Sequence, residues 1–388
     1  MKGNELKILF IISSLKIGGA QNLLLNICRI ISDKYNIKVK VIALRGGEIS
    51  EEFTRAGIDT VIFNYNCLVS AGVFSDIYRI IKDFSPDIVH THLQKADFYG
   101  RICARLAGVN IIITTCHSTS IVHKKTFYPV EKLYELIDNF VARYSRSVVV
   151  AISESVRKWL IKRNRYFSNV TYVINNGIDI NQFNGELSPE TAAKLRNNLG
   201  LKNQGKVLAF IGRLEYQKGV DILLKELEPE LCNNVNLTLL LVGDGNMLND
   251  LKKKYTKLLN QGKIIFTGFR QDIPDIIKLS DIIIVPSRRE GLGNIILEAM
   301  ASRKIVLCSD VDAIPEIIND GVNGFLFNIN TPDSLVSRLK YIINNFERLS
   351  NVRNSAYNYV NEKFNINITA DRYYNYYLKL LNKFNNAE

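Results

Sequence analysis

Residues 281–301 read Asp-Ile-Ile-Ile-Val-Pro-Ser-Arg-Arg-Glu-Gly-Leu-Gly-Asn-Ile-Ile-Leu-Glu-Ala-Met-Ala, and this stretch contains the repeating unit of the fold. Its apolar run, 281–285, predicts a buried strand that ends at Pro286. A glycine-containing loop follows, and a helix is expected to open near Asn294. Apolar strands that alternate with helices are typical of parallel sheets covered by helices on both faces. The stretch therefore predicts one step of a doubly wound α/β sheet.

The same alternation extends in both directions along the chain. Strands are predicted at 7–14, 39–44, 60–63, 87–90, 111–115 and 147–151, and then at 206–211, 237–242, 263–267 and 304–308. Helical spacing is clearest at 20–31, 127–144, 189–199 and 365–384. The alternation pauses near 173–184, where Asn175-Asn-Gly-Ile-Asp reads as a turn. We predict one domain at 1–174 and another at 175–364, with a helix at 365–388 that packs back on the first domain.

The length of the chain favours two domains, and its positive charge is concentrated in the first half. A chain of 388 residues is long for a single compact unit. The net charge is +12, and residues 1–174 hold 24 Lys and Arg against 14 Asp and Glu. Such an excess attracts phosphates or an anionic membrane surface, and the alternative is a solvated basic surface without a specific partner.

Cysteine usage and hydropathy indicate an intracellular environment. The six cysteines (Cys28, Cys67, Cys103, Cys116, Cys232 and Cys308) show no Cys-x-x-Cys spacing, so neither a zinc site nor a redox motif is indicated, and we expect mostly buried thiols. Residues 7–15 are apolar but lack a cleavage site, and no run approaches a membrane span. We expect a cytoplasmic protein, or one attached peripherally to the inner face of the cell membrane.

Two common nucleotide motifs are absent. Neither half contains Gly-x-Gly-x-x-Gly, and neither contains Gly-x-x-x-x-Gly-Lys-Ser/Thr. Hydride transfer and P-loop hydrolysis are therefore weak interpretations. No recognised nucleic-acid motif accompanies the basic excess.

Cations and glycines follow the first strand of each half. Arg213 and Lys218 lie in Phe210-Ile-Gly-Arg-Leu-Glu-Tyr-Gln-Lys-Gly219, at the carboxyl edge where such sheets bind ligands. An arginine fork and a lysine point charge suit a diphosphate, and two solvated surface charges are the alternative. Gly18 and Gly19 stand between a strand and a helix, where a phosphate can approach the backbone or the chain can simply turn tightly.

Carboxylates and histidines supply the remaining candidates. Glu290 lies in the loop of the opening stretch, and Glu298 lies just over one turn inside the following helix. Each can accept hydrogen bonds from hydroxyl groups, and a surface position is the alternative for Glu298. His90 and His92 end one strand on the same face, where we favour a hydrogen-bonded structural role over metal ligation. His117 ends the next strand and is the stronger functional candidate.

In order along the chain, these blocks resemble the retaining glycosyltransferases of family 4, which have the GT-B arrangement of two Rossmann-like doubly wound domains facing an interdomain cleft. The resemblance covers essentially the whole chain. It rests on the sequences Gly18-Gly-Ala20, Pro86-Asp-Ile-Val-His-Thr-His92, His117, Asn176-Gly-Ile-Asp179, Gly212-Arg-Leu with Lys218-Gly219, Val242-Gly-Asp-Gly245 and Thr267-Gly-Phe269. Its most specific element is the family's Glu-x7-Glu motif, here Glu290 and Glu298.

The resemblance implies a role for each residue. Arg213 and Lys218 would hold the donor diphosphate, helped by Gly18 and Gly19. Glu298 would bind the ribose, and Glu290 would bind the transferred sugar. The helix start at Gly293, Asn294 and Ile295 would contribute further donor contacts, and the backbone near Phe269 and Arg270 would hold the base. His117 would contact the sugar near the reacting carbon, so the expected catalytic set is His117, Glu290, Arg213 and Lys218.

The sequence departs from the family at three turns. Gln21 stands where a glutamate often follows Gly-Gly-Ala. Arg303-Lys-Ile305 replaces the usual Gly-Lys/Arg-Pro, and Asp312-Ala313 replaces a pair of glycines. None of these changes touches the cationic or carboxylate positions.

The implied function is retaining transfer of a sugar, with a UDP-sugar favoured, onto a glycan or lipid-linked acceptor in cell-surface polysaccharide or glycolipid synthesis. No metal or other cofactor is expected, since Arg213 and Lys218 would neutralise the diphosphate. The alternatives are a nucleotide-sugar epimerase and a non-catalytic nucleotide-sugar-binding partner. The basic segment 156–165, with Trp159 and Leu160 interleaved, is expected either to rest on an anionic membrane or to be a core-packed helix with a charged outer face.

Overall fold

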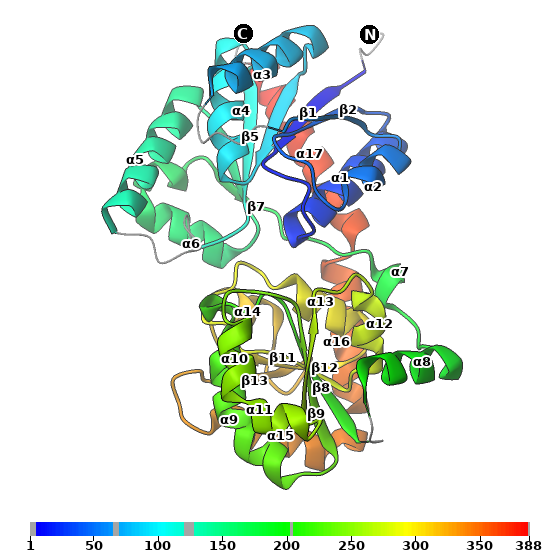
Figure 1. Cartoon of the computed structure of the whole chain (residues 1–388). Helices are drawn as coiled ribbons and strands as arrows, with labels where there is room; N and C mark the ends of the chain where they lie inside the picture. Colours follow the sequence, from blue (N-terminus) through cyan, green and yellow to red (C-terminus); the bar gives the residue numbers. More distant parts are fainter. Residues whose placement is uncertain (1–4, 65–69, 120–127, 202–204, 387–388) are drawn as a thin grey trace. The chain divides into compact units, whose positions relative to one another are not determined.

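The computed structural model describes residues 5–64, 70–119, 128–201 and 205–386 (Figure 1). The chain divides into two compact units. Unit 1 comprises Met1–Gly177 together with Ile366–Glu388, and unit 2 comprises Ile178–Asn365. The sequence placed the boundary between 174 and 175, within the same turn region. No helix among the described residues is long and apolar enough to cross a membrane.

Unit 1 is built on a parallel sheet in the order β3-β2-β1-β4-β5-β6-β7. In chain order the strands are β1 (Lys7–Ile12), β2 (Lys38–Ala43), β3 (Asp59–Ile62), β4 (Ile88–His92), β5 (Ile111–Cys116), β6 (Val148–Ala151) and β7 (Thr171–Val173). The helices are α1 (Gly19–Tyr35), α2 (Ser50–Arg55), α3 (Ala71–Phe84), α4 (Gln94–Leu106), α5 (Tyr128–Ser145), α6 (Glu154–Arg163) and α17 (Ile366–Asn385), with a 3-10 turn at Arg165–Ser168.

Helices cover both faces of this sheet. Alternate residues of β1 belong to different cores: Ile8 and Phe10 pack with α1 and α17, whereas Leu9 and Ile11 pack with α3 and α4. This two-sided burial explains why the strands read as continuous apolar runs. The C-terminal helix α17 lies against α1, and its Tyr373 and Tyr377 are fully buried in unit 1.

Unit 2 repeats the plan with the order β10-β9-β8-β11-β12-β13. Its strands are β8 (Lys206–Ile211), β9 (Leu237–Val242), β10 (Ile264–Gly268), β11 (Ile282–Val285), β12 (Ile305–Ser309) and β13 (Phe325–Phe327). Its helices are α7 (Ile180–Phe183), α8 (Pro189–Leu199), α9 (Val220–Asn233), α10 (Leu248–Lys254), α11 (Thr256–Asn260), α12 (Ile273–Leu279), α13 (Asn294–Ala301), α14 (Ile314–Ile317), α15 (Ser334–Asn344) and α16 (Ser350–Lys363), with 3-10 turns at Tyr216–Lys218 and Phe346–Leu349.

The predicted pair of Rossmann-like doubly wound domains is confirmed by these two sheets. In each sheet the strand order reverses beside the first strand, between β1 and β4 and between β8 and β11. The carboxyl ends of the strands at such a reversal are where open α/β sheets bind ligands. Each unit therefore offers one position for a site.

The structure corrects several local predictions. Strands β7 and β13 were missed, because edge strands of three residues are too short to stand out as strands in the sequence. Strand β1 ends at Ile12 rather than at residue 14, and the Ser13 hydroxyl accepts a hydrogen bond from the Ala96 N–H. Strand β4 continues to His92. Among the cysteines, Cys28, Cys103 and Cys308 are buried as expected, Cys116 is partly exposed, Cys232 is exposed and Cys67 lies outside the described residues.

Candidate active site

Two loops meet at the strand reversal of unit 2, because β8 and β11 are hydrogen-bonded neighbours. The loop after β11 is tied to the loop after β8 by Arg288. Its guanidinium forms a bidentate ion pair with Asp221, with both N–O distances 2.7 Å, and donates to the Tyr216 carbonyl at 2.6 Å. The Arg288 N–H also donates to the Gln217 carbonyl at 2.8 Å. These contacts hold the two loops as one surface.

Gly219 lets the two loops approach this closely. Its φ is +69°, a left-handed conformation that favours glycine. A Cβ at this position would stand 1.8 Å from the carbonyl oxygen of Pro286, well inside van der Waals contact. The glycine after Lys218 is therefore a packing requirement of the site.

Lys218 and Glu290, both predicted site residues, contact each other directly. The Lys218 Nζ donates to Glu290 Oε2 at 2.6 Å, and the Ser287 hydroxyl donates to the same oxygen at 3.1 Å. Both side chains are largely buried. The Glu290 N–H in turn donates to the Asp312 carboxylate at 3.0 Å. The structure thus places an ammonium and a carboxylate together at the carboxyl end of the sheet.

Arg213 begins the same loop but has a different partner. Its guanidinium lies 2.7 Å from the Glu215 carboxylate, and its side chain is about half exposed, at 49%. The geometry gives the loop two cations, one fixed to a buried carboxylate and one accessible to solvent. A dianionic group is the ligand that such a pair of cations favours.

Helix α13 starts at Asn294, as predicted, and Gly293 caps it with a φ of +89°. The predicted donor residues Gly293, Asn294 and Ile295 therefore occupy the N-terminal end of this helix, where the helix dipole favours negative charge. Glu298 lies one turn further along. Burial raises the pKa of the Glu298 carboxyl to about 7, and no side chain in the described part of unit 2 donates a hydrogen bond to it.

Glu298 gives the unliganded protein a testable pH dependence. Since its folded-state pKa lies above its ordinary value of 4.5, the folded chain holds this proton more tightly than the unfolded chain does. Stability is lost as pH rises from about 4.5 to about 7. Between pH 5 and pH 8, we expect the free energy of unfolding of the wild type to fall by about 2 kcal/mol more than that of Glu298→Gln. Urea unfolding at the two pH values measures this difference, and parallel pH profiles for the two proteins would contradict it.

Phe269 and Arg270 follow β10, the edge strand, which is separated from β8 by β9. The Phe269 side chain is exposed, at 53%. The Arg270 guanidinium is held by Asp272, with an Nε–Oδ1 distance of 2.8 Å. This segment shares the carboxyl edge of the sheet with Arg213, and it lies to one side of the strand reversal.

In unit 1, Gly18 and Gly19 lie at the N-terminus of α1, with Gly18 as the cap residue. Gly18 has an extended φ of −179°, so its conformation does not itself require glycine. A Cβ there would meet the Gln21 side-chain oxygen at 2.7 Å, and Gln21 Nε2 donates to the Ser14 carbonyl at 3.3 Å. Gln21, one of the departures from the family, therefore links the start of α1, beside Gly18 and Gly19, to the segment that follows β1.

Three histidines lie together next to the strand reversal of unit 1; His90 and His92 are buried, and His117 is partly exposed. The two ring nitrogens of His90 contact the Tyr377 hydroxyl at 2.9 Å and the Thr115 hydroxyl at 2.8 Å, which supports the structural role predicted for it. His92 Nδ1 lies 3.1 Å from His117 Nε2. Burial lowers the pKa of His117 to about 4, so the imidazole is neutral at pH 7. No group of three or more His, Cys, Asp or Glu side chains in the described ranges is arranged to hold a metal ion.

The two other departures occupy turns with positive φ. Arg303 has a φ of +52° and Asp312 has a φ of +45°, which explains why glycine is common at both positions in the family. The Arg303 guanidinium donates to the Asn184 side chain at 2.7 Å and stacks over Tyr357. Asp312 accepts from the Glu290 backbone N–H, so this departure does reach a site residue.

The segment 156–165 forms most of α6 and is packed against the core. Val156 and Leu160 are buried, and Trp159 lies under the Arg163 guanidinium. Of the two forms considered for this segment, the structure shows the core-packed helix with a charged outer face. Leu160 is therefore unavailable to a membrane surface.

Sequence reasoning missed three residues that shape the site: Asp221, Ser287 and Arg288. Ser287 and Arg288 stand within the quoted stretch 281–301, so their position after a buried strand was a signal. Asp221 gave no signal, because its partner Arg288 is 67 residues away in sequence.

Models of glycosyltransferase families match both units of the chain. A family model described as Glycosyltransferase Family 4 matches residues 17–182, and another, Glycosyl transferases group 1, matches residues 192–359. The Escherichia coli UDP-Gal:alpha-D-GlcNAc-diphosphoundecaprenol alpha-1,3-galactosyltransferase is 28% identical over 328 residues, 84% of this chain and 83% of that protein.

Solved structures show the same architecture. Anabaena HepE in complex with UDP aligns over 95% of this chain and 99% of its own, with a TM-score of 0.80 and 25% identity. The same protein in complex with UDP-glucose covers 98% of this chain and 100% of its own, with a TM-score of 0.83 and 24% identity. Since two glycosyltransferase family models together match residues 17–182 and 192–359, a named glycosyltransferase matches over 84% of the chain, and the solved structures share its two-sheet architecture, this chain is a glycosyltransferase of the GT-B fold.

Proposed function

We propose that this glycosyltransferase moves a sugar from UDP to a glycan or lipid-linked acceptor in cell-surface polysaccharide or glycolipid synthesis, with retention of anomeric configuration. The observation that carries the proposal is the Lys218–Glu290 pair at the strand reversal of unit 2. The relatives support the donor and acceptor classes: the E. coli protein is named for UDP-Gal and a diphosphoundecaprenol acceptor, and HepE binds UDP-glucose.

Donor binding in this proposal exchanges internal contacts for contacts with the ligand. The Lys218 ammonium and the Arg213 guanidinium leave their internal carboxylate partners and bind the diphosphate. Glu290 can then accept hydrogen bonds from sugar hydroxyls. The Glu298 carboxylate accepts hydrogen bonds from the ribose hydroxyls, and these hydrogen bonds favour its ionised form. The N-terminus of α13 adds a positive potential, and the backbone near Phe269 and Arg270 holds the base. The predicted contribution of Gly18, Gly19 and His117 from unit 1 stays a prediction.

The chemical step needs no protein nucleophile. The acceptor hydroxyl attacks the anomeric carbon from the face that the diphosphate leaves, so one C–O bond forms as another breaks. The hydroxyl proton passes to an oxygen of the departing diphosphate, and the products are the glycosylated acceptor and UDP. Lys218 and Arg213 stabilise the charge that grows on the leaving group, a contribution of a few kcal/mol for each preorganised contact. We propose that these cations do this without a metal ion.

A thermal-shift screen of UDP-, GDP- and ADP-sugars tests the donor assignment. At about 100 times its dissociation constant, a ligand stabilises the folded state by about 2.7 kcal/mol. For units of this size we expect a UDP-sugar to raise Tm by about 5 °C or more, and GDP- and ADP-sugars to raise it less.

The same preparation decides the reaction class. NMR of the product is expected to show the anomeric configuration of the donor, and an inverted product would contradict retention. An isomerised sugar formed from donor alone would instead identify an epimerase, the alternative activity. Stabilisation without turnover by any acceptor would favour a non-catalytic partner.

A further inference from the structure

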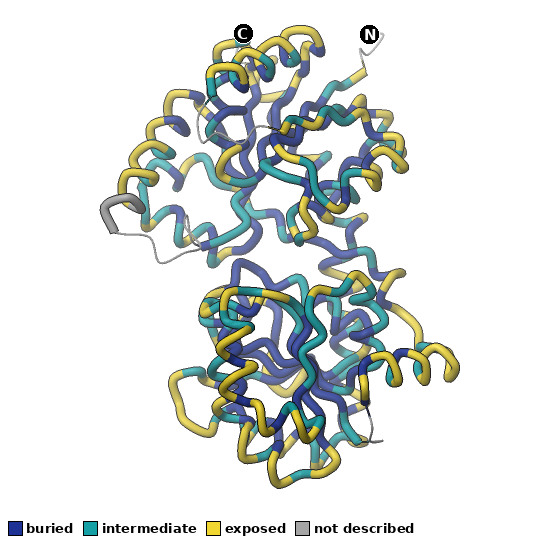
Figure 2. Tube along the Cα trace, viewed as in Figure 1, coloured by how far each residue is buried: buried dark blue, intermediate teal, exposed yellow. Residues whose placement is uncertain are grey.

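A cavity lies at the amino edge of the unit 2 sheet. Its volume is about 580 Å³, within the range of roughly 300–1,000 Å³ that is typical of small-molecule sites. Asp281 and Lys304 mark its position, because they line it and directly precede β11 and β12. These two strands are buried along their whole length (Figure 2). The candidate active site lies at the opposite, carboxyl end of the same sheet, so the cavity is a separate place.

Positive charge predominates among the side chains that line this cavity. The cations are Lys278, Arg303, Lys304 and Arg353, and the carboxylates are Glu186 and Asp281. Within residues 5–64, 70–119, 128–201 and 205–386, none of the four cations forms an ion pair, and Asp281 instead pairs with Lys206 at 3.5 Å. The lining therefore has a surplus of two positive charges, which a phosphate dianion would balance.

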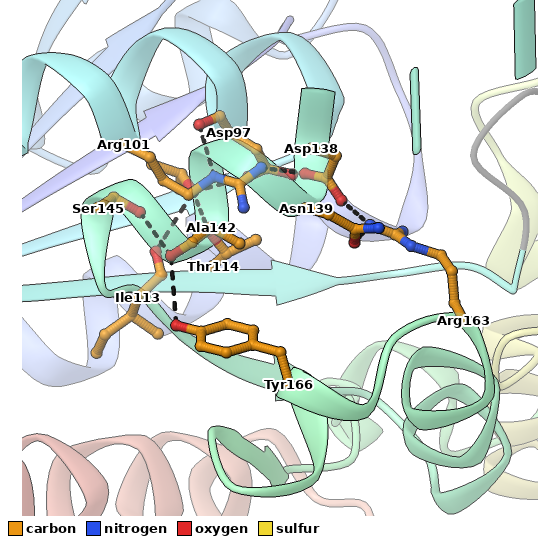
Figure 3. Close-up of polar contacts among 11 residues, drawn as sticks. Asp97, Arg101, Ile113, Thr114, Asp138, Asn139, Ala142, Ser145, Arg163 and Tyr166 are labelled. Carbon is orange, nitrogen blue, oxygen red and sulfur yellow. Dashed lines mark hydrogen bonds and ion pairs between the residues drawn. The ribbon is translucent and has the colours of Figure 1, made fainter. Parts of the chain in front are cut away.

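Withdrawn cations in other parts of the chain show the usual arrangement. In unit 1, the buried Arg101 and Arg163 both form ion pairs with Asp138 (Figure 3). In unit 2, the half-buried Arg288 pairs with Asp221. A cation that is withdrawn from water normally has such a partner, because an unpaired charge loses part of its hydration. The cations of the cavity can still accept an anion from outside the chain.

Helix ends explain three of the four cations. Lys278 is in the last turn of α12, Arg303 and Lys304 follow the end of α13, and the Lys304 Nζ donates to the Lys278 carbonyl at 2.6 Å. Positive charge is favourable at these C-terminal ends. Arg353 is different, because it is the fourth residue of α16 and stands near the positive end of that helix. Ser350 begins α16 without a side-chain cap hydrogen bond, so this helix start also favours an anion.

The position of Arg353 is unfavourable in the free chain. Its guanidinium lies 4.9 Å from the ring centroid of Phe346 and makes no hydrogen bond to any residue that the structure describes. Burial lowers the pKa of the Lys304 ammonium, and Arg353 lowers it further, against the opposite effects of Asp281 and Glu186. Arg353 and Lys304 therefore repel each other. An anion bound to both would remove this repulsion, and a guanidinium can bind two oxygens of one phosphate.

We infer that this cavity binds a phosphate group, and its size favours one carried by a small metabolite. The Arg353 guanidinium binds the phosphate oxygens, Lys304 adds a point charge, and the start of α16 supplies backbone N–H donors. The cavity is larger than a phosphate ion needs, and Ser350 and Asn354 in its lining can form hydrogen bonds with hydroxyl groups of the rest of the ligand. This inference is independent of the proposed sugar transfer.

Isothermal titration calorimetry of the full chain tests the inference with three probes: glucose 6-phosphate, inorganic phosphate and glucose. We expect glucose 6-phosphate to bind with a Kd below about 1 mM, and glucose not to bind. Weaker binding of inorganic phosphate would confirm a metabolite as the source of the phosphate group, whereas equal or tighter binding would confirm phosphate recognition with the free ion as ligand. No binding of either phosphate compound would overturn the inference.

Arg353→Gln is expected to weaken binding of both phosphate compounds by about tenfold or more, because a charge-assisted contact is lost. Arg348→Gln is the matched control. Arg348 is an exposed arginine of the preceding 3-10 turn and does not line the cavity, so affinity should stay within about twofold of the wild type. Equal affinity of Arg353→Gln and the wild type would overturn the inference.

Stability gives a second readout for Arg353→Gln. Because the arginine is unfavourable in the free chain, urea unfolding without ligand should show unchanged or higher stability for the variant. Lower stability with unchanged phosphate affinity would show that Arg353 serves only to pack on Phe346, and would overturn the inference.

Lys218→Ala separates the cavity from the candidate active site. It removes a cation at the carboxyl edge of the sheet and should leave binding of glucose 6-phosphate unchanged. Loss of binding in Lys218→Ala, with binding retained in Arg353→Gln, would place the phosphate at the carboxyl edge and overturn the inference. Since every readout is binding or unfolding of the chain without a sugar donor, a failure here is distinguishable from a failure of the proposed transfer.

Discussion

Lys218→Ala is expected to lower kcat/KM for sugar transfer by about 10²–10³ while the fold persists. The ammonium lies 2.6 Å from Glu290 at the strand reversal, and in the proposed mechanism it also stabilises the charge on the departing diphosphate. Removing it takes away a preorganised contact that strengthens in the transition state. It also leaves the Glu290 carboxylate with Ser287 as its remaining side-chain donor among the described residues, so we expect a stability loss of about 1–2 kcal/mol. Initial rates and urea unfolding measure the two effects.

Unit 2 supplies a control for this prediction. Lys340 forms an ion pair of the same length, 2.6 Å, with Glu230, on helices away from the strand reversal. Lys340→Ala should therefore change kcat/KM by less than about twofold, since a more exposed pair contributes little. Near-normal transfer by both Lys218→Ala and Arg213→Ala would contradict the diphosphate assignment.

Gly219→Ala is expected to destabilise the protein by about 3 kcal/mol or more and to abolish most transfer. The added Cβ would lie 1.8 Å from the Pro286 carbonyl oxygen, so the loop after β8 must move away from the loop after β11. That movement displaces Lys218 from Glu290 and disturbs the Arg288–Asp221 pair. Strain from the positive φ adds about 1 kcal/mol.

Gly262→Ala separates the two causes. Gly262 has the same φ of +69°, but a Cβ there would meet nothing within 4 Å. Gly262→Ala should therefore cost only the conformational strain, about 1 kcal/mol, and should leave transfer intact. Equal stability losses in the two variants, measured by urea unfolding, would show that the close approach to Pro286 contributes nothing.

The central strands were predictable because burial on both faces makes them continuous apolar runs. Strands β8 and β9 have the predicted bounds, and α8 agrees with its predicted range. The edge strands β7 and β13 were not predicted, since a run of three residues is too short to identify a strand.

The candidate site was predictable to the extent that it is local. Arg213, Lys218, Glu290 and Glu298 each lie shortly after a buried strand, and parallel strands bring their carboxyl ends to one edge. The sequence could not show that Lys218 pairs with Glu290, or that Asp312 accepts from the Glu290 N–H, because these contacts join separate strand–helix steps.

Helices α5 and α6 show the same limit: the helix at 127–144 was predicted, and for 156–165 both a membrane-facing form and a core-packed form were left open. The apolar residues of α6 look amphipathic in sequence, yet Val156 and Leu160 face the core. In α5, Asp138 decides which face points inward, because its partners Arg101 and Arg163 come from two other helices. A helical pattern alone reports that an apolar face exists and does not report whether another element covers it.

The central claim is that a nucleoside diphosphate binds at the carboxyl edge of the unit 2 sheet. A crystal structure of the chain with UDP tests this most directly. We predict phosphate oxygens within about 3 Å of Lys218 Nζ and the Arg213 guanidinium, with the ribose hydroxyls on the Glu298 carboxylate. A UDP molecule bound elsewhere, with Lys218 still paired to Glu290 and Arg213 still paired to Glu215, would contradict the account.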